Sequence, residues 1–280
     1  MHNIKEPTMD DELLAIADLD VVTAQFPECE RLGREVEIAR QTYDRLFPYH
    51  FPPVAGLDYC GASRPALEVG GDYFDFLNFL SLPSPKLGIA IGDVSGKGIP
   101  AAMLMPILRT SLRGLTIFPY ANLAALATNL NGLVYEALSP NHFASFFYAE
   151  YEVPTRRLTY VNAGHNPPIV LRNRSHEYQV MRLEVGGGLL GLFRESSYCQ
   201  ATVALESGDL VIAYTDGLSE ATNLQGQQWG EDRLIRTAKT CSGLNLSAAD
   251  TVDALLEAVS TFARGARQQD DIALVILRVS

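Results

Sequence analysis

The sequence predicts an α+β protein in which groups of β-strands are separated by pairs of helices. Two observations carry this prediction. Short segments rich in β-branched and aromatic residues follow one another after Pro53, and stretches with helical periodicity lie between them. The helical stretches come in pairs, whereas a doubly wound sheet would alternate strand and helix strictly. With 47% hydrophobic and 20% charged residues among 280, the composition is that of an ordinary globular protein.

The expected elements can be placed along the chain. Strands are expected at residues 54–62, 71–80, 86–94, 143–153, 157–164, 167–172, 177–183, 209–217 and 272–279. Helices are expected at residues 100–115, 121–138, 231–239 and 247–264. Because no internal repeat or low-complexity linker follows residue 50, we expect one domain over residues 50–280, preceded by a tail and one helix within residues 1–49.

The N-terminal 49 residues contain one amphipathic pattern. It alternates steps of three and four between apolar positions and stops before Pro48; these positions are Cys29, Leu32, Val36, Ala39, Tyr43 and Leu46. The pattern predicts a helix from about Glu28 to Phe47 with one apolar seam. With fewer than three heptads, two interpretations stay open: packing on its own domain, or pairing with a second copy in a homodimer.

Charge and cysteine content exclude several classes. The formal net charge of −11 and a pI near 4.9 disfavour nucleic acid and anionic membranes as partners. The four cysteines form no CxxC pair, which disfavours a structural zinc site and a disulfide scaffold. The N-terminus lacks a signal-peptide pattern, and no apolar stretch is long enough to span a bilayer. We therefore expect a cytoplasmic protein with no membrane partner.

Four aspartates lie at the ends of expected strands and suggest a metal site. They are Asp72 in VGGDYFDF, Asp93 in IAIGDVSGKG, Asp216 in VIAYTDGLSE and Asp270 in RQQDDIALVIL. A single Asp-Gly pair is usually only a turn. Recurrence at four strand ends is better explained by convergence on one cation cluster, because carboxylate oxygens suit Mg²⁺ or Mn²⁺. Two such ions a few ångströms apart would activate a water and neutralise phosphoryl oxygens.

Five blocks in fixed order then carry a family resemblance. The blocks are VGGDYFDF, GDVSGKGIPAAMLM, LTYVNAGHNPPIVL, VIAYTDGLSEATN and QQDDIALVIL. Over roughly residues 50–279 the chain resembles the SpoIIE/RsbU branch of the PPM-type bacterial phosphatases. The resemblance implies a four-layer αββα sandwich after the N-terminal helix, and two Mn²⁺ or Mg²⁺ ions, with a third as an alternative. It also implies phosphoserine or phosphothreonine proteins as substrates, often anti-sigma-factor antagonists.

The resemblance assigns roles residue by residue. Asp93 resembles the carboxylate that bridges the metals, and the carbonyl of Val94 resembles a further ligand. Asp216 and Asp270 resemble the carboxylates of the second metal. Asp72 matches the family's aspartate in the GGD block, which binds metal or its ordered waters. Asp271 is a weaker candidate than Asp270, because related enzymes can carry Asn at the second position of the pair.

Two positions depart from the family pattern. Ala273 stands where the family usually has Thr, which removes a hydroxyl but no metal ligand. Pro106 lies within the helix expected after GDVSGKG, where it should introduce a kink because proline lacks the N–H and clashes one turn back. Neither change argues for an inactive enzyme.

Three further residues keep two interpretations each. His165 is either a general acid or, as we favour, a structural residue. Lys97 either neutralises charge near the site or is a solvated loop lysine. Arg64 either binds a phosphate bidentately or is a surface arginine, which is the safer interpretation.

The sequence thus predicts metal-dependent hydrolysis of phosphoserine or phosphothreonine on a partner protein by a metal-activated water. One alternative is a degenerate phosphatase that acts as a non-catalytic binding module, which four intact aspartates disfavour. Another is a phosphatase for small phosphate esters, because a metal site alone does not define a substrate. A further hypothesis makes the N-terminal helix a regulatory lever that acts through the two helices between residues 100 and 138.

Overall fold

The computed structural model describes residues 30–48, 50–137, 142–174 and 177–280. Residues 45–280 form one compact unit, and the helix at residues 30–44 belongs to a second unit that is described by itself. The tail predicted before this helix, and Cys29 in its apolar pattern, lie outside the described residues.

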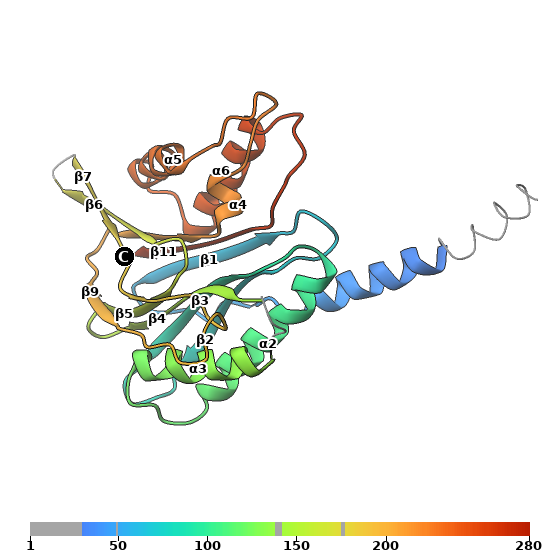
Figure 1. The fold of residues 1–280 in the computed structure, drawn as a ribbon. Helices are drawn as coiled ribbons and strands as arrows, with labels where there is room; N and C mark the ends of the chain where they lie inside the picture. The colour runs from blue at the N-terminus through green and yellow to red at the C-terminus, as the bar shows by residue number, and fades with distance from the viewer. Residues whose placement is uncertain (1–29, 49, 138–141, 175–176) are drawn as a thin grey trace, which may run out of the picture. The chain divides into compact units, whose positions relative to one another are not determined.

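Two β-sheets form the centre of the compact unit (Figure 1). The five-stranded sheet has the order β1-β11-β10-β6-β7, with bounds Leu57–Arg64, Ile272–Val279, Leu210–Tyr214, Ile169–Arg174 and Glu177–Arg182. The six-stranded sheet has the order β2-β3-β4-β5-β8, with bounds Asp72–Phe79, Lys86–Val94, Ala144–Glu152, Arg157–Ala163 and Gly186–Gly187; β9, Ala201–Ala204, also pairs with β5. All strand pairs are antiparallel except β5 with β8.

Helices cover the outer faces of both sheets. The helices α2, Ile99–Leu115, and α3, Leu123–Ala137, lie on the six-stranded sheet, while α5, Glu231–Gly243, and α6, Ala248–Phe262, lie on the five-stranded sheet (Figure 1). This arrangement confirms the predicted α+β class and the four-layer αββα sandwich. Because both faces of each sheet are covered, the central strands are almost continuously apolar instead of alternating with polar residues.

The core between the sheets is built from side chains of both. Phe74, Ile89 and Phe147 come from the six-stranded sheet, and Tyr59 and Val275 come from the five-stranded one; all belong to one buried cluster. Each fully buried side chain of this size stabilises the fold by roughly 1.5–3 kcal/mol relative to exposure. The cluster fixes the two sheets against each other, and with them the strand ends that carry the aspartates.

Two details of the expected elements are wrong. The strand expected at residues 209–217 ends at Tyr214, and Asp216 instead begins the one-turn helix α4, Asp216–Ser219. Thr215 is extended and starts that turn, because its carbonyl accepts from the Leu218 N–H at 3.1 Å. The short strands β8 and β9 were not predicted, since a Gly-Gly pair and a four-residue segment carry no usable periodicity.

The helix α2 starts after the short segment 95–98, which follows the end of β3 at Val94, and an ion pair with the buried Asp75 carboxylate ties it to β2. It continues as one helix on both sides of Pro106. The fully buried carboxylate of Asp75 on β2 accepts two hydrogen bonds from the Arg113 guanidinium, both at 2.7 Å, and one from the Tyr73 hydroxyl at 3.0 Å. The Arg109 guanidinium lies 3.7 Å from the same carboxylate. These contacts fix the position of α2 on the sheet.

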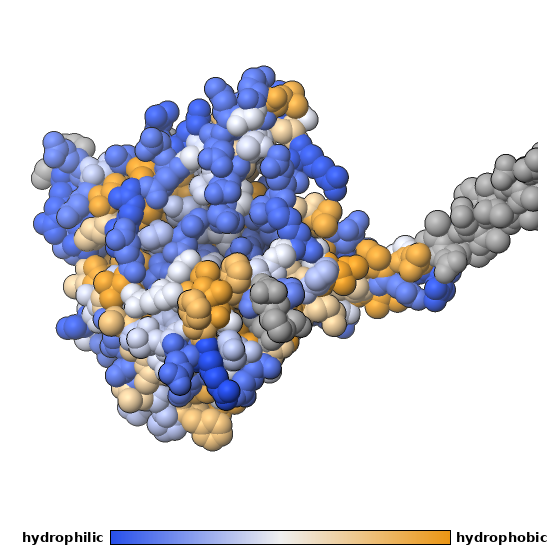
Figure 2. Space-filling view, in the orientation of Figure 1, coloured by the Kyte–Doolittle hydropathy of each residue, from blue (hydrophilic) through white to orange (hydrophobic). Residues whose placement is uncertain are grey.

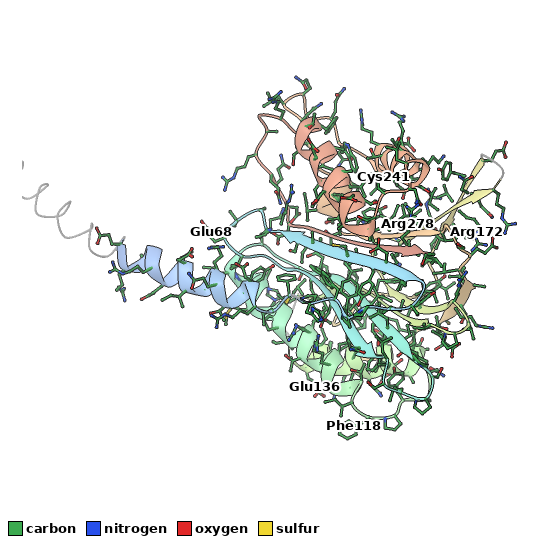
Figure 3. The ribbon with its side chains drawn as sticks, turned by 180° about the vertical axis from the view of Figure 1, so that it is seen from behind. Glu68, Phe118, Glu136, Arg172, Cys241 and Arg278 are labelled. Atoms are coloured by element: carbon green, nitrogen blue, oxygen red, sulfur yellow. The ribbon has the colours of Figure 1, made fainter. Side chains whose placement is uncertain are left out.

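A buried ion pair joins two neighbouring strands inside the five-stranded sheet, β6 and β10. Arg172 on β6, labelled in Figure 3, donates to both carboxylate oxygens of Asp209 and to the Ala204 carbonyl. Asp209 directly precedes β10, so this pair sets where β10 begins. The strand that leads to Asp216, β10, is therefore fixed both by this ion pair at its start and by the buried core around its side chains.

The helix at residues 30–44 ends before Pro48, as the sequence predicts. Its surface carries ion pairs at helical spacing, among them Arg31 with Glu35 and Arg40 with Asp44. On the predicted seam, Leu32 is 48% exposed and Tyr43 is buried. Whether the seam packs or pairs with a second copy stays a prediction. In the described part of the chain, no helix is both long and apolar enough to cross a membrane.

Candidate active site

The register of two neighbouring strands brings Asp72 and Asp93 together. Asp72 is the first residue of β2 and lies directly opposite Asp93 near the end of β3. Facing residues of an antiparallel pair have Cβ atoms about 4.5–5.5 Å apart, so the two carboxylates share one edge of the six-stranded sheet. Asp72 is buried, and Asp93 is partly accessible.

Asp216 and Asp270 reach the same edge from the other sheet. Asp216 follows β10 and Asp270 precedes β11, which are antiparallel neighbours. Between the sheets stands Thr215, a fully buried residue whose hydroxyl donates to Asp72 Oδ2 at 2.6 Å and accepts from the Ala273 N–H at 2.7 Å. One hydroxyl thus connects an aspartate of one sheet to the backbone of the other.

The glycines of the GGD block fit closely around Asp271 and Val94. The Asp271 carboxylate accepts from the N–H groups of Ala66 and Gly71, both at 2.8 Å. A Cβ on Gly70 would lie 2.2 Å from Asp271 Oδ2, and a Cβ on Gly71 would lie 2.6 Å from the Val94 carbonyl oxygen. Asp271 therefore holds the loop in place, and the missing side chain of Gly71 leaves space in front of the Val94 carbonyl.

The electrostatics of the group are those of crowded carboxylates. Burial, followed by the charges of Asp216, Asp270 and Asp271, raises the pKa of Asp93 to about 7. Burial, followed by the charge of Asp93, raises the pKa of Asp72 well above its usual range, against the smaller opposing effect of the Thr215 hydrogen bond. Burial, followed by the charge of Asp270, also raises the pKa of Asp216. After burial, the mutual repulsion of the carboxylates is what raises these pKa values.

Lys97 places a positive charge beside these carboxylates. Its Nζ donates to Asp270 Oδ2 at 2.7 Å and to the Gln269 carbonyl at 2.8 Å. Of the two interpretations left open, this contact supports charge neutralisation at the site. Among the described residues, no three His, Cys, Asp or Glu side chains stand close enough to share one ion as they are placed. Both carboxylate oxygens of Asp270 already accept hydrogen bonds, Oδ2 from Lys97 and Oδ1 from the Asp271 N–H.

His165 lines a cavity of about 200 Å³ together with Asp93 and Asp216. Its Nδ1 lies 2.8 Å from the hydroxyl of Ser145, which is opposite Asp93 in the register of β3 and β4. Burial lowers the pKa of His165 to about 4, against a smaller opposing effect of the Tyr214 backbone, so the ring is neutral near pH 7. This geometry supports the structural interpretation of His165 over the general acid.

Arg64 and Ala273 also take definite positions. Arg64 is the last residue of β1 and exposed, with its Nη1 3.4 Å from the Ser260 hydroxyl. Ala273 is fully buried in the core between the sheets, and its backbone holds Thr215. The sequence reasoning missed Thr215, although it directly precedes the Asp-Gly pair, because a threonine at a strand end carries no signal of its own.

Comparisons with known proteins give the family. A family model described as "Stage II sporulation protein E (SpoIIE)" matches residues 83–280. The phosphoserine phosphatase RsbU of Bacillus subtilis is 30% identical over 254 residues, which cover 89% of this chain and 71% of RsbU. The phosphoserine phosphatase RsbP of the same organism is 26% identical over 196 residues, which cover 68% of this chain but only 46% of RsbP.

Solved structures agree in fold. The SiaA-PP2C domain of Pseudomonas aeruginosa superposes with a TM-score of 0.76 at 17% identity, covering 90% of this chain and 99% of that domain. The catalytic domain of the serine/threonine protein phosphatase PstP, a complex with 2 manganese ions, gives a TM-score of 0.56 at 14% identity, covering 80% and 98%. Fold, family model and sequence relatives agree: the chain belongs to the SpoIIE family, on the SpoIIE/RsbU branch of the PPM-type phosphatases.

Proposed function

We propose that this protein removes phosphate from phosphoserine or phosphothreonine on a partner protein, with divalent cations held by its aspartates. The observation that carries the proposal is the convergence of Asp72 and Asp93 from one sheet with Asp216 and Asp270 from the other. Family membership and the names of RsbU and RsbP, both phosphoserine phosphatases, support the reaction class.

The residues fit a hard divalent cation. The donors are carboxylate and carbonyl oxygens, the ligands that Mg²⁺ and Mn²⁺ prefer. Burial and then the neighbouring carboxylates raise the pKa of Asp93, an arrangement that a bound cation would relieve, and the absent Cβ of Gly71 leaves the Val94 carbonyl accessible. We assign Asp93, the Val94 carbonyl, Asp216 and Asp270 as ligands, with Asp72 bound directly or through water. Two Mn²⁺ or Mg²⁺ ions match this donor set, and a third stays open.

When bound, such ions supply Lewis-acid stabilisation of phosphoryl oxygens and a water of lowered pKa. The protein's own groups prepare the site for this chemistry. Thr215 orients Asp72, Asp271 fixes the GGD loop, and Ser145 fixes the neutral ring of His165. Because burial lowers the pKa of His165, we assign the proton for the leaving serine oxygen to another group or to solvent.

The partner is proposed to be a phosphorylated signalling protein of the anti-sigma-factor antagonist class. The support is the similarity to RsbU, whose sequence this chain covers to 71%. We further propose that the helix at residues 30–44 joins two copies through its seam, on which Leu32 is 48% exposed. This dimer is tested by comparing the solution mass of the full chain with that of a Leu32→Glu variant. The proposal predicts a dimer for the wild type and a monomer for the variant, and equal masses would contradict it.

The reaction itself is tested with the full chain, a phosphoserine peptide and para-nitrophenyl phosphate, each with Mn²⁺, with Mg²⁺ and with EDTA. The proposal predicts hydrolysis of the peptide that depends on the cation. Full activity in EDTA would contradict metal dependence. Turnover of the ester alone would favour a small-ester phosphatase, and binding of the phosphopeptide without turnover would favour the degenerate module.

A further inference from the structure

A second cavity opens beside the candidate site. Its volume is about 390 Å³, and Gly217 and Asp270 line it, so it borders the carboxylates directly. Its walls come from the end of α6 and the segment that leads to β11, and apolar side chains of Leu256, Val259 and Ile272 form part of the lining. The volume lies within the range of about 300–1,000 Å³ that is typical of ligand sites.

The charge of this cavity is opposite to that of the chain. Four cationic side chains line it, against the carboxylates of Glu220 and Asp270; the cations are Arg64, Lys97, Arg264 and Arg267. Lys97 and Asp270 pair with each other at 2.7 Å. Within the described ranges, no ion pair involves Arg64, Arg264 or Arg267. Three guanidinium groups therefore stand together with Glu220 in a chain whose formal net charge is −11.

The cavity borders Asp270, one of the proposed ligands, so residues flanking a phosphoserine held at the aspartates would lie near it. Each residue of an extended peptide advances the chain by about 3.3 Å. The first few residues on either side of the phosphoserine would therefore contact the surface next to the aspartates. Figure 2 shows that the face carrying α4 and α6 is mostly hydrophilic. Arg264 and Arg267, which line the cavity, are exposed and accessible to a partner.

We propose that this arginine pocket, lined by Arg64, Arg264 and Arg267, recognises acidic residues that flank the phosphorylated serine of the substrate protein. The guanidinium fork binds carboxylates in a bidentate manner, and complementary charge favours the correct partner and speeds encounter. This inference rests on the proposed function and deepens it, because it assigns a substrate preference to residues outside the aspartate cluster.

The test compares two phosphoserine peptides of equal length, one flanked by Asp and Glu and the other by Asn and Gln, with para-nitrophenyl phosphate as a third substrate. The enzyme is the full chain with Mn²⁺, either wild type, the double variant Arg264→Glu/Arg267→Glu, or Arg236→Glu. Arg236 is an exposed residue of α5 outside the pocket, and its substitution tests the same charge reversal at a single position elsewhere on the surface. Thermal unfolding followed by circular dichroism checks that the variants are folded.

We expect the double variant to lower the preference for the acidic peptide, measured as the ratio of kcat/KM values, by roughly tenfold, or about 1.4 kcal/mol. Turnover of para-nitrophenyl phosphate should stay unchanged, Arg236→Glu should behave as wild type, and added salt should weaken the preference. An unchanged ratio would overturn the pocket, as would an equal loss on all three substrates.

Binding separates this inference from the proposed function. Fluorescence anisotropy of the labelled acidic peptide reports the pocket even where no turnover occurs. A wild-type chain that hydrolyses neither peptide nor ester with Mn²⁺ refutes the proposed function. If that chain still binds the acidic peptide more tightly than the neutral one, and the double variant does not, the pocket stands. Equal binding of both peptides by the wild type refutes it.

Discussion

Replacing Asp93 with Asn should stabilise the cation-free protein at neutral pH while it destroys activity. The native carboxyl has its pKa raised from 3.8 to about 7, first by burial and then by the charges of Asp216, Asp270 and Asp271. The native state therefore binds more protons than the unfolded state between about pH 4 and pH 7, so stability falls as pH rises through this window. A pKa difference of this size between the folded and unfolded states corresponds to a few kcal/mol of stability, on the order of 1.4 kcal/mol for each tenfold change in proton affinity.

The measurement is urea unfolding in EDTA at a series of pH values from 4 to 8. The variant should be a few kcal/mol more stable than wild type at pH 8, and the difference should shrink towards pH 4. Adding Mn²⁺ should stabilise the wild type and leave the variant nearly unaffected, because a ligand of the native state shifts the equilibrium by mass action. A variant that is less stable than wild type at pH 8 would refute this account of the carboxylate cluster.

Three further substitutions have distinct expected outcomes. Asp75→Asn should lower the free energy of unfolding by roughly 1.5–3 kcal/mol, because it weakens the hydrogen bonds that the buried, charged carboxylate accepts from Arg113; a change within error in urea unfolding would remove that role. Thr215→Val removes the hydroxyl between Asp72 and the Ala273 N–H and should destabilise by about 2–3 kcal/mol, against about 1 kcal/mol for Thr251→Val, whose hydroxyl donates only to a helix carbonyl. Equal losses of stability in the two variants would contradict the role of the Thr215 hydroxyl in connecting Asp72 to the Ala273 backbone. Asp216→Asn should lower kcat by orders of magnitude with Mn²⁺ and leave the fold intact by circular dichroism, and wild-type turnover would exclude Asp216 from the site.

Much of the fold could be predicted from local pattern. The paired helices and the apolar strand runs have clear periodicities, and Pro48 marks a boundary that local sterics enforce. The segment at Asp216 shows where this fails. A run such as DLVIAYTDG looks like one strand, but the turn from β10 into α4 depends on the Thr215 carbonyl and on the neighbouring strand β11. Such tertiary contacts leave no local pattern.

The site follows the same division. The aspartates could be predicted from the sequence because each stands at the end of an expected strand. The sheet topology then brings these strand ends close together. Thr215 and the loop-holding role of Asp271 depend on residues more than 50 positions away in the chain, Asp72 and Gly71, so no spacing rule could have indicated them. The same applies to Arg264 and Arg267. Their proposed role in substrate recognition depends on a cavity that only the folded chain forms.

The central claim is that the converging carboxylates hold divalent cations for phosphoserine hydrolysis. The most direct measurement is the initial rate of phosphate release from a phosphoserine peptide as Mn²⁺ is titrated into EDTA-treated protein, for wild type and for Asp93→Asn. The account predicts saturable activation of the wild type and no comparable activity of the variant at any Mn²⁺ concentration. Activity of the wild type that does not depend on Mn²⁺ or Mg²⁺, or a variant activated like wild type, would contradict it.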